Sequence, residues 1–441
     1  MQRMTSRFRL LPIALAPLLA VGALANSAAA SSEYVDAVVG ESPTGVAVSD
    51  DGVIAAGLFD AKAVALVKPD GTVRRASIGC SPSDVAISPD GATAWAVCQE
   101  SEHLSVVDIA SLGVSQASMG VVGLDAIDYL PEVDELVIGS LQGTVLAVRE
   151  VATGGYSIYM STNIQDVTPG VGVTQLAPLS DGSGAYAITD GGDLIFVDLE
   201  FGGQVALIAD GSPRRFFNSI AMGPFDTALY AAVMDYDTAD IKNTVEIVDM
   251  ATGASRQSVL LDAVTPGSTT IELTAGNRAV YAAFGLYVTT STGATGLLTV
   301  AVDDGGRLAG VQGADAPAAA GSAAALSADG SRVVFGTTNA GAVGLSVDGD
   351  PYPAAIRLAA KATGSKLRIT GTTTSMRPLT ALTVYVKDLT KKKTRFVKQA
   401  KPALLNYQGD ITWSGKAPSK RFALYLSGGG AKSTTVTVTV R

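Results

Sequence analysis

The feature that most constrains this fold is an apolar strand that runs into an Asp-Gly turn and recurs along the chain. Strong copies end at Gly52, Gly91, Gly182 and Gly330, and weaker copies occupy residues 127–131, 220–224 and 271–276. The strong glycines lie 39, 91 and 148 residues apart, so the two longer intervals divide into two and three units of similar length. In such turns Asp accepts hydrogen bonds from the turn backbone and Gly takes positive φ. The pattern predicts seven similar units of short strands.

A second, independent pattern is an apolar strand in the third position of each unit. Its seven copies occupy residues 64–67, 104–108, 145–148, 194–198, 245–249, 298–303 and 343–348. Units of about 40–50 residues with four strands each are typical of β-propeller blades. Because two unrelated patterns give the same number, the sequence predicts an all-β, seven-bladed β-propeller over residues 31–350.

The chain also contains a strand that can close the ring. Each of the first six units has room for a fourth, outer strand, such as residues 72–78 or 203–208, whereas the seventh unit ends after Val347. A spare apolar strand at residues 34–39 precedes the first unit. We expect it to pair with the last blade, which leaves only short and protected sheet edges.

Three stretches carry a resemblance to a known family. They are Gly-Glu-Ser-Pro-Thr-Gly-Val-Ala-Val-Ser at residues 40–49, residues 79–91 with the strand that follows, and residues 245–253, which end in Val-Asp-x-Ala-Thr-Gly. The chain resembles the YVTN family of bacterial β-propellers, close to the NHL and lactonase-like propellers, over about residues 31–350. The family contains enzymes, binders and structural proteins, so the resemblance implies the fold and leaves the function open.

Residues 1–30 have the pattern of a secretory signal peptide. Arg3, Arg7 and Arg9 precede an apolar run at residues 10–25, and small residues at 28–30 form a cleavage site. The alternative is a retained membrane anchor, but the run is short and contains proline. No second apolar segment is long enough to span a bilayer, so we expect no transmembrane segment after cleavage. The mature protein is predicted to be secreted and extracellular, and to associate with the cell wall.

Charge divides the chain into two modules. Residues 31–350 contain 12 Lys and Arg against 39 Asp and Glu, a net charge of −27, whereas residues 351–441 contain 17 against 2, a net charge of +15.

Seven short predicted strands in the second module suggest an immunoglobulin-like β-sandwich. Lys391, Lys392 and Lys393 lie on a predicted hairpin tip, which is either a solvated turn or a contact for an anionic surface. Binding to an anionic cell-wall polymer, or docking on the acidic propeller, would both follow; nucleic acid is not an expected partner.

The two cysteines lie at the ends of paired segments. Cys80 precedes the first strand of the second unit, and Cys98 ends its second strand. If these strands pair around the Pro-Asp-Gly turn, both cysteines fall at the same end of the hairpin, and export supplies an oxidising setting. We predict a disulfide, with two free thiols as the alternative. Two thiolates are too few for a metal site.

The only histidine, His103, begins a predicted third strand. One imidazole cannot form a multi-histidine metal site. It could act alone as a general acid or base, but no serine or cysteine motif accompanies it. We therefore interpret His103 as an ordinary residue at the edge of a loop and predict no catalytic residues.

The fifth unit contains the candidate ligand-binding loops. One loop precedes its first strand and the other follows its second strand, and in a propeller these two kinds of loop emerge on the same face. The candidate residues are Arg214, Arg215, Phe217, Asn218, Asp235 and Tyr236. Arginine beside phenylalanine suits a carboxylate, a phosphate or a sugar ring. The alternative is an internal Arg–Asp ion pair.

No cofactor is predicted. Asp235, Asp237 and Asp240 offer oxygen ligands that Ca²⁺ would accept, but the loop lacks the Asp-x-Asp-x-Asp-Gly order of known calcium loops. Calcium therefore stays an alternative at these three residues, and no other metal is expected.

The sequence favours a secreted, monomeric binding protein without catalytic activity. One face of the propeller would hold a protein, a peptide or a glycan, and the basic sandwich would tether it to the anionic cell envelope. The first alternative is a lactonase-like hydrolase or lyase that uses Arg and Asp residues on that face. The second is a structural envelope protein whose propeller acts as a spacer.

Overall fold

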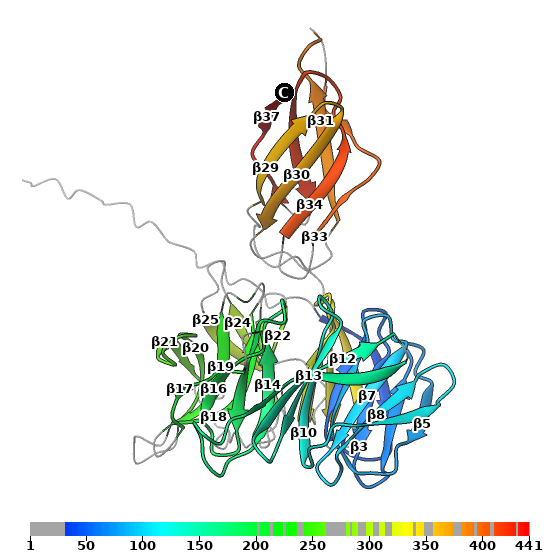
Figure 1. The fold of residues 1–441 in the computed structure, drawn as a ribbon, viewed down its shortest axis with the longest axis vertical. Helices are drawn as coiled ribbons and strands as arrows, with labels where there is room; N and C mark the ends of the chain where they lie inside the picture. The colour runs from blue at the N-terminus through cyan, green and yellow to red at the C-terminus, as the bar shows by residue number, and fades with distance from the viewer. Residues whose placement is uncertain are drawn as a thin grey trace, which may run out of the picture.

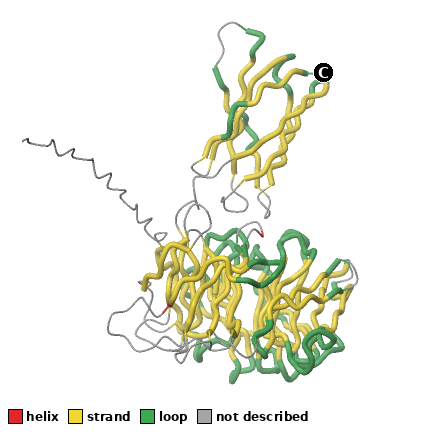
Figure 2. The backbone as a smooth tube through the Cα atoms, turned by 90° about the vertical axis from the view of Figure 1, so that its left-hand side faces the viewer, coloured by secondary structure: helices red, strands yellow, loops and turns green. Residues whose placement is uncertain are grey.

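The structure is a computed structural model, and it contains strands and loops almost throughout (Figure 2). It describes residues 31–152, 154–200, 203–211, 215–223, 226, 228–235, 242–261, 279–282, 285–289, 297–302, 308–313, 320–337, 341–347, 356–373, 381–391, 395–405, 410–428 and 431–440. The predicted signal peptide and the start of the second module, residues 351–355, lie outside these ranges. Among the described residues, no helix is long and apolar enough to cross a membrane.

The first three sheets each contain four antiparallel strands that pair in chain order (Figure 1). The first contains β2 (Val46–Val48), β3 (Ile54–Leu58), β4 (Ala63–Val67) and β5 (Val73–Ser77). The second contains β6 (Pro82–Ile87), β7 (Thr93–Cys98), β8 (His103–Asp108) and β9 (Val114–Ser118). The third contains β10 (Leu124–Leu130), β11 (Glu135–Ser140), β12 (Thr144–Val151) and β13 (Gly155–Asn163).

The next three sheets repeat this order. The fourth contains β14 (Val173–Pro178), β15 (Gly184–Thr189), β16 (Leu194–Asp198) and β17 (Val205–Ala209). The fifth contains β18 (Arg215–Met222), β19 (Leu229–Asp235), β20 (Lys242–Val248) and β21 (Ser255–Leu260). The sixth contains β22 (Ala279–Ala282), β23 (Gly285–Thr289), β24 (Leu297–Val302) and β25 (Leu308–Gly313).

The seventh four-stranded sheet of the described residues combines strands from both ends of the ring. It contains β26 (Ala320–Leu326), β27 (Arg332–Thr337), β28 (Gly341–Val347) and, as the outer strand, β1 (Ser31–Val38). The register runs antiparallel from Ser31 opposite Val347 to Val38 opposite Gly341. The predicted pairing of residues 34–39 with the last unit is therefore confirmed for the part of the segment that β1 covers.

The first strands of successive sheets form a closed ring. Each of β2, β6, β10, β14, β18, β22 and β26 contacts the next, and β26 contacts β2. Apolar side chains fill the space between neighbouring sheets, as where Val35 and Val334 of the seventh sheet pack with Val46 and Ile54 of the first. The all-β class is confirmed, and the four-stranded antiparallel sheets are arranged as in a β-propeller.

The recurring Ser-x-Asp-Gly sequence has a local physical cause. In the second sheet Ser88 Oγ donates a hydrogen bond to Asp90 Oδ1 at 2.7 Å, and the same carboxylate accepts from the Ala92 amide at 3.1 Å. Gly91 then takes a φ of 64°, which side chains rarely adopt. The side chains thus close the turn between the first two strands and fix where each sheet reverses direction.

The predicted disulfide is present. Cys80 and Cys98 are bonded and buried, with Cα atoms 6.2 Å apart. Pro82 lies opposite Cys98 in the register of β6 and β7, so the bond joins the segment that enters the second sheet to the end of its second strand. It holds one rim of that sheet in place.

The remaining strands form a separate group around their own core (Figure 1). They are β29 (Ile356–Thr363), β30 (Lys366–Thr373), β31 (Ala381–Asp388), β32 (Val397–Lys398), β33 (Ala403–Leu405), β34 (Asp410–Lys416), β35 (Arg421–Gly428), β36 (Ala431–Lys432) and β37 (Val436–Thr439). Inward side chains of β30 and β34, such as Ile369 and Trp413, share this core with Val384 of β31 and Leu424 of β35. Two layers of strands therefore enclose a single core.

The seam between the seventh and first sheets carries a half-buried carboxyl group, that of Asp50. The Asp329 amide donates to Asp50 Oδ1 at 2.9 Å, and Arg332 Nε donates to the Asp50 carbonyl at 3.0 Å. Burial raises the pKa of Asp50 to about 6, and the negative charge of Asp329 adds to this, whereas the amide of Asp329 and the charge of Arg332 act in the opposite direction. The ring therefore closes more favourably when Asp50 is protonated.

This raised pKa predicts a stability that depends on pH. Because the folded protein holds the Asp50 proton to higher pH than the unfolded chain, stability falls between about pH 4 and pH 6 as the carboxyl ionises. Asp50→Asn keeps an oxygen acceptor for Asp329 and removes the charge. We expect the variant to match the wild type at pH 4 and to be about 1–2 kcal/mol more stable at pH 7.5, since solvent screens a half-exposed carboxylate. Urea unfolding at both pH values measures this, and an equal difference at both would contradict it.

Candidate functional site

The fifth sheet brings two of the predicted site residues to one end. Arg215 begins β18, Asp235 ends β19, and the register places them directly opposite each other. The predicted residues Arg214, Tyr236, Asp237 and Asp240 lie outside the described residues. The predicted proximity of the two loops of the fifth unit therefore holds for Arg215 and Asp235. The calcium site at Asp235, Asp237 and Asp240 stays an untested alternative.

Arg215 is engaged within the protein. Its guanidinium forms an ion pair with Glu246 of β20, Nη1 donates to the Gly253 carbonyl at 2.7 Å, and Cζ lies 4.6 Å from the centre of the Phe217 ring. The side chains of Arg215 and Glu246 are only 26% and 9% exposed. Thr244 Oγ1 donates to the other Glu246 oxygen at 3.1 Å. The sequence-based alternative of an internal ion pair describes this arrangement, with glutamate in the place of aspartate.

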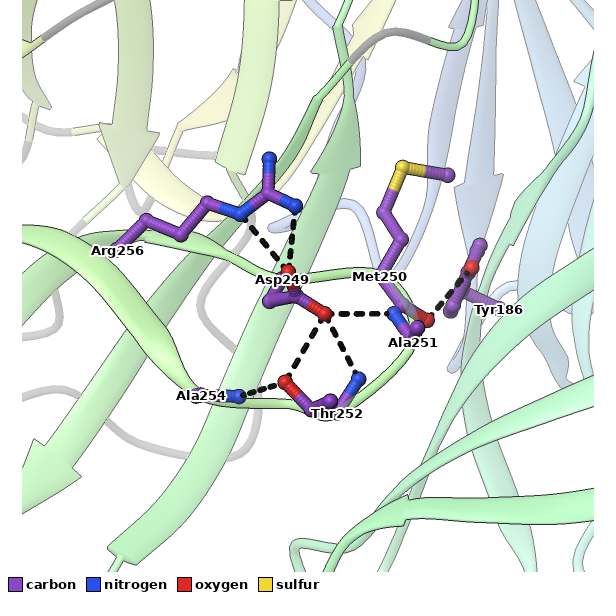
Figure 3. A network of polar contacts seen from close by, with 7 residues as sticks. All are labelled: Tyr186, Asp249, Met250, Ala251, Thr252, Ala254 and Arg256. Atoms are coloured by element: carbon purple, nitrogen blue, oxygen red, sulfur yellow. Dashed lines mark hydrogen bonds and ion pairs between the residues drawn. The ribbon is translucent and has the colours of Figure 1, made fainter.

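The Val-Asp-x-Ala-Thr-Gly sequence builds the turn whose Gly253 carbonyl accepts from Arg215. Figure 3 shows the contacts of Asp249 within this turn. Asp249 Oδ1 accepts hydrogen bonds from the amides of Ala251 and Thr252 at 3.0 and 2.9 Å, and Oδ2 accepts from Arg256 Nε at 2.9 Å. The hydrogen bond from Arg256 is the main reason why the pKa of Asp249 is lowered to about 2, and Thr252 adds to it. This turn also contacts the fourth sheet, because Tyr186 Oη donates to the Met250 carbonyl at 2.9 Å. The sequence motif thus fixes a contact between sheets.

Phe217 and Asn218 are both buried. Phe217 belongs to the core between the fourth and fifth sheets. Asn218 occupies a bulge in β18, is 3% exposed, and its amide oxygen and nitrogen have no hydrogen-bond partner among the described residues. A buried amide without partners is costly, so Asn218 is a position where a bound polar group would be favourable.

Residues equivalent to Asn218 join the first strands of successive sheets. Thr44, next to β2, donates to the Pro82 carbonyl of β6 at 2.7 Å, and Ser83 of β6 donates to the Leu124 carbonyl of β10 at 3.0 Å. The side chain of Asp125 then accepts from Gln99 Nε2 at 2.7 Å instead. Polar side chains therefore occupy this position at the first strands of the first, second, third and fifth sheets. Sequence reasoning did not identify these positions, although the repeats that end at Gly52 and Gly91 have Thr44 and Ser83 directly after a proline.

A second polar position links the second sheet to the third and the fourth sheet to the fifth. Asp84 Oδ2 accepts from the Ile127 amide at 3.3 Å. Gln175 accepts from the Ile220 amide at 3.1 Å and donates to the Ile220 carbonyl at 3.2 Å. These side chains supply hydrogen-bond partners to backbone groups of the following sheet and so join neighbouring sheets.

Asp128 is the least expected polar residue of the first strands. In the repeats it occupies the place of Ala47 and Ala86, which are buried between sheets. Burial raises the pKa of Asp128 to about 7, and the charge of Asp84 adds to this, while the hydrogen bond from the Tyr129 amide lowers it. A carboxyl that holds its proton near neutral pH can donate it. The replacement of alanine by aspartate in a repeat is the sequence signal that would have identified this residue.

His103 begins β8 and lies close to Ser101. Its ring Nδ1 lies 3.5 Å from Ser101 Oγ, and its backbone amide donates a hydrogen bond to that same oxygen at 3.0 Å. In the part of the chain that the structure describes, no group of three or more His, Cys, Asp or Glu residues is arranged to hold a metal ion. His103 stays interpreted as a residue at the edge of a loop.

No protein-family model matches the chain, and neither does any curated protein. Solved structures match it by shape. Virginiamycin B lyase from Staphylococcus aureus is 12% identical with a TM-score of 0.53, covering 72% of this chain and 99% of that chain. Hydrazine synthase of Kuenenia stuttgartiensis is 15% identical with a TM-score of 0.53, covering 69% and 95% respectively.

A chain of the mitotic checkpoint complex is 15% identical with a TM-score of 0.52, covering 78% of this chain and 99% of that chain. These neighbours are β-propeller proteins. This chain has a β-propeller fold. At such low identity the likeness extends to the fold alone, and propellers of this shape include both enzymes and parts of binding complexes. Membership of the YVTN family stays a prediction.

The Arg215–Glu246 pair predicts a structural rather than a ligand-binding role for Arg215. Arg215→Ala leaves the carboxylate of Glu246 buried without its cation, and we expect a loss of about 3 kcal/mol in the free energy of unfolding. The matched control is Arg256→Ala, which breaks the ion pair with Asp249 at an arginine that is 62% exposed, and should cost less than about 1 kcal/mol. Urea unfolding at pH 7.5 gives both values. Equal losses in the two variants would show that the buried pair has no special role.

Proposed function

We propose that this chain is an exported, monomeric binding protein without catalytic activity. In this proposal a YVTN-type, seven-bladed propeller over residues 31–350 follows a cleaved signal peptide at residues 1–30. A basic, immunoglobulin-like sandwich over residues 351–441 tethers the propeller to an anionic polymer of the cell envelope. The propeller presents one face to a protein, a peptide or a glycan.

The observation that carries the proposal is the exposed, unbalanced positive charge of the second module. Its net charge is +15, and its described Lys and Arg residues are exposed, except for the half-buried Lys387. Among its described residues one ion pair is present, between Lys391 and Asp388 at 3.8 Å, and the Lys391 side chain is 74% exposed. Such a surface attracts polyanions over several ångströms and is weakened by salt.

The ligand face of the propeller is proposed at the fifth sheet. Arg215 and Phe217 support this face from within, since the first is ion-paired and the second is buried. Asn218 offers its buried amide, and Asp235 lies at the same end of the sheet. We assign direct ligand contacts to Asn218, Asp235, Arg214 and Tyr236.

The tether predicts retention on cell walls that depends on salt. The full-length protein should be retained on purified bacterial walls at about 50 mM NaCl and released at about 500 mM, because salt at that concentration screens charges beyond a few ångströms. Walls from which the anionic polymers have been extracted are the matched control and should retain little protein. Sedimentation of the walls and assay of the supernatant measures both. Salt-independent retention, or equal retention on extracted walls, would contradict the tether.

A hydrolase or lyase remains the second candidate because of Asp128. Its raised pKa and place on a first strand suit a general acid, and one structural neighbour is a lyase. This function predicts turnover of a lactone or an ester that Asp128→Asn lowers at least about a hundredfold. The measurement is a substrate screen at pH 6–8. Asp50→Asn is the control, because it removes a carboxyl with a raised pKa elsewhere in the propeller. Activity that survives in Asp128→Asn would rule out this role, and no turnover in the wild type favours the binding protein.

A further inference from the structure

One face of the second module carries an arrangement of cations that folding alone does not explain. In β29, β30 and β34, which are neighbours in the sheet, alternate side chains point into the core and out to solvent. Ile369 and Trp413 are among the inward ones. The exposed cations on the outer face, which we call the cationic face, are Arg357, Lys361, Lys366, Arg368 and Lys416.

Two pairs of these cations lie directly opposite each other on neighbouring strands. Lys361 is opposite Arg368 in the β29–β30 register, and Lys366 is opposite Lys416 in the β30–β34 register. Like charges in such positions destabilise a sheet. None of the five forms an ion pair with a described residue. The acidic residue of these strands is Asp410, at the far end of β34, and its side chain lies outside the described ones.

The other described side chains of the cationic face are small. The exposed residues between the cations are Ala359, Thr363, Thr370, Thr412 and Ser414, so no large side chain interrupts it. Residues two apart on a strand are about 6.5–7 Å apart, and neighbouring strands are about 4.8 Å apart. The cations therefore repeat at intervals that a chain of regularly spaced anionic groups can follow.

We propose that the cationic face is the docking surface for a linear polyanion, whose repeating phosphate or carboxylate groups lie across β29, β30 and β34. The argument is charge complementarity, since bound anions would relieve the repulsion within both like-charge pairs. This inference rests on the tether of the proposed function and narrows it to one face. It places binding on the strands rather than on the hairpin tip at Lys391.

The test compares two full-length triple variants with the same change in net charge. Lys361→Gln, Arg368→Gln and Lys416→Gln remove three cations from the cationic face. Lys398→Gln, Lys401→Gln and Lys420→Gln remove three exposed cations elsewhere in the module. Each protein is titrated by calorimetry with long-chain polyphosphate, and separately with polygalacturonate, at several salt concentrations.

We expect the face variant to bind about tenfold to a hundredfold more weakly than the wild type, and the control variant to lose less than about threefold. The face variant should also show a smaller dependence of affinity on salt, because fewer counterions are displaced. If the face variant loses affinity for polyphosphate alone, the face recognises phosphate groups. If it loses affinity for both polymers, the face recognises polyanions in general. Equal weakening in the two variants would overturn the inference.

The melting temperature and the retention on cell walls distinguish failure of the docking inference from failure of the tether. Because the face variant loses like-charge repulsion, we expect it to melt at the same temperature as the wild type or higher, so that a lower affinity does not reflect unfolding. If the wild type is retained on cell walls and the face variant is retained equally, the inference fails while the tether stands. If the wild type binds polyphosphate through the face but is not retained on walls, the proposed function fails instead. Self-association that the face variant abolishes would identify the acidic propeller of a second copy as the occupant and overturn the proposal.

Discussion

The pairing of β1 with β28 is the constraint on which the rest of the propeller depends. Without it the seventh sheet lacks its outer strand, and the core that joins the seventh and first sheets loses Val35 and Ala37. Several hydrogen bonds support the same seam, including Arg75 Nη2 to the Val39 carbonyl at 2.7 Å and the Asp329 amide to Asp50. Because each first strand contacts the first strand of the next sheet around the ring, the closure fixes the positions of the loops that carry the proposed ligand site.

The parts of this fold that follow local rules were predictable from the sequence. Turns such as Ser88 to Gly91 need a carboxylate, a hydroxyl and a glycine at fixed spacing, and these leave a visible repeat. The disulfide was predictable for the same reason, since Cys80 and Cys98 flank a hairpin whose register follows from its turn. The closing strand was predictable by counting, because one unit had a strand too few.

The candidate site was less predictable, because its contacts join residues that no local pattern relates. Arg215 is bound by Glu246 and by the Gly253 carbonyl, from a later strand and a later turn. The raised pKa of Asp128 arises from burial between sheets, which depends on how the ring packs. The cationic face likewise becomes apparent only from the pairing register of β29 and β30, which places Lys361 opposite Arg368. Composition showed that the second module is basic but not where its charges meet.

The closure also governs the order in which the propeller can form. β1 is complete early in synthesis, whereas β28, its partner, is made only after the six intervening sheets. Bringing such distant segments together is entropically costly and slow. Until then, the inner three strands of the seventh sheet and β1 both present unpaired edges, which invite association between chains. The seam between the first and seventh sheets is therefore the place where a newly made chain is most exposed to misassembly, and where a chaperone would have most to protect.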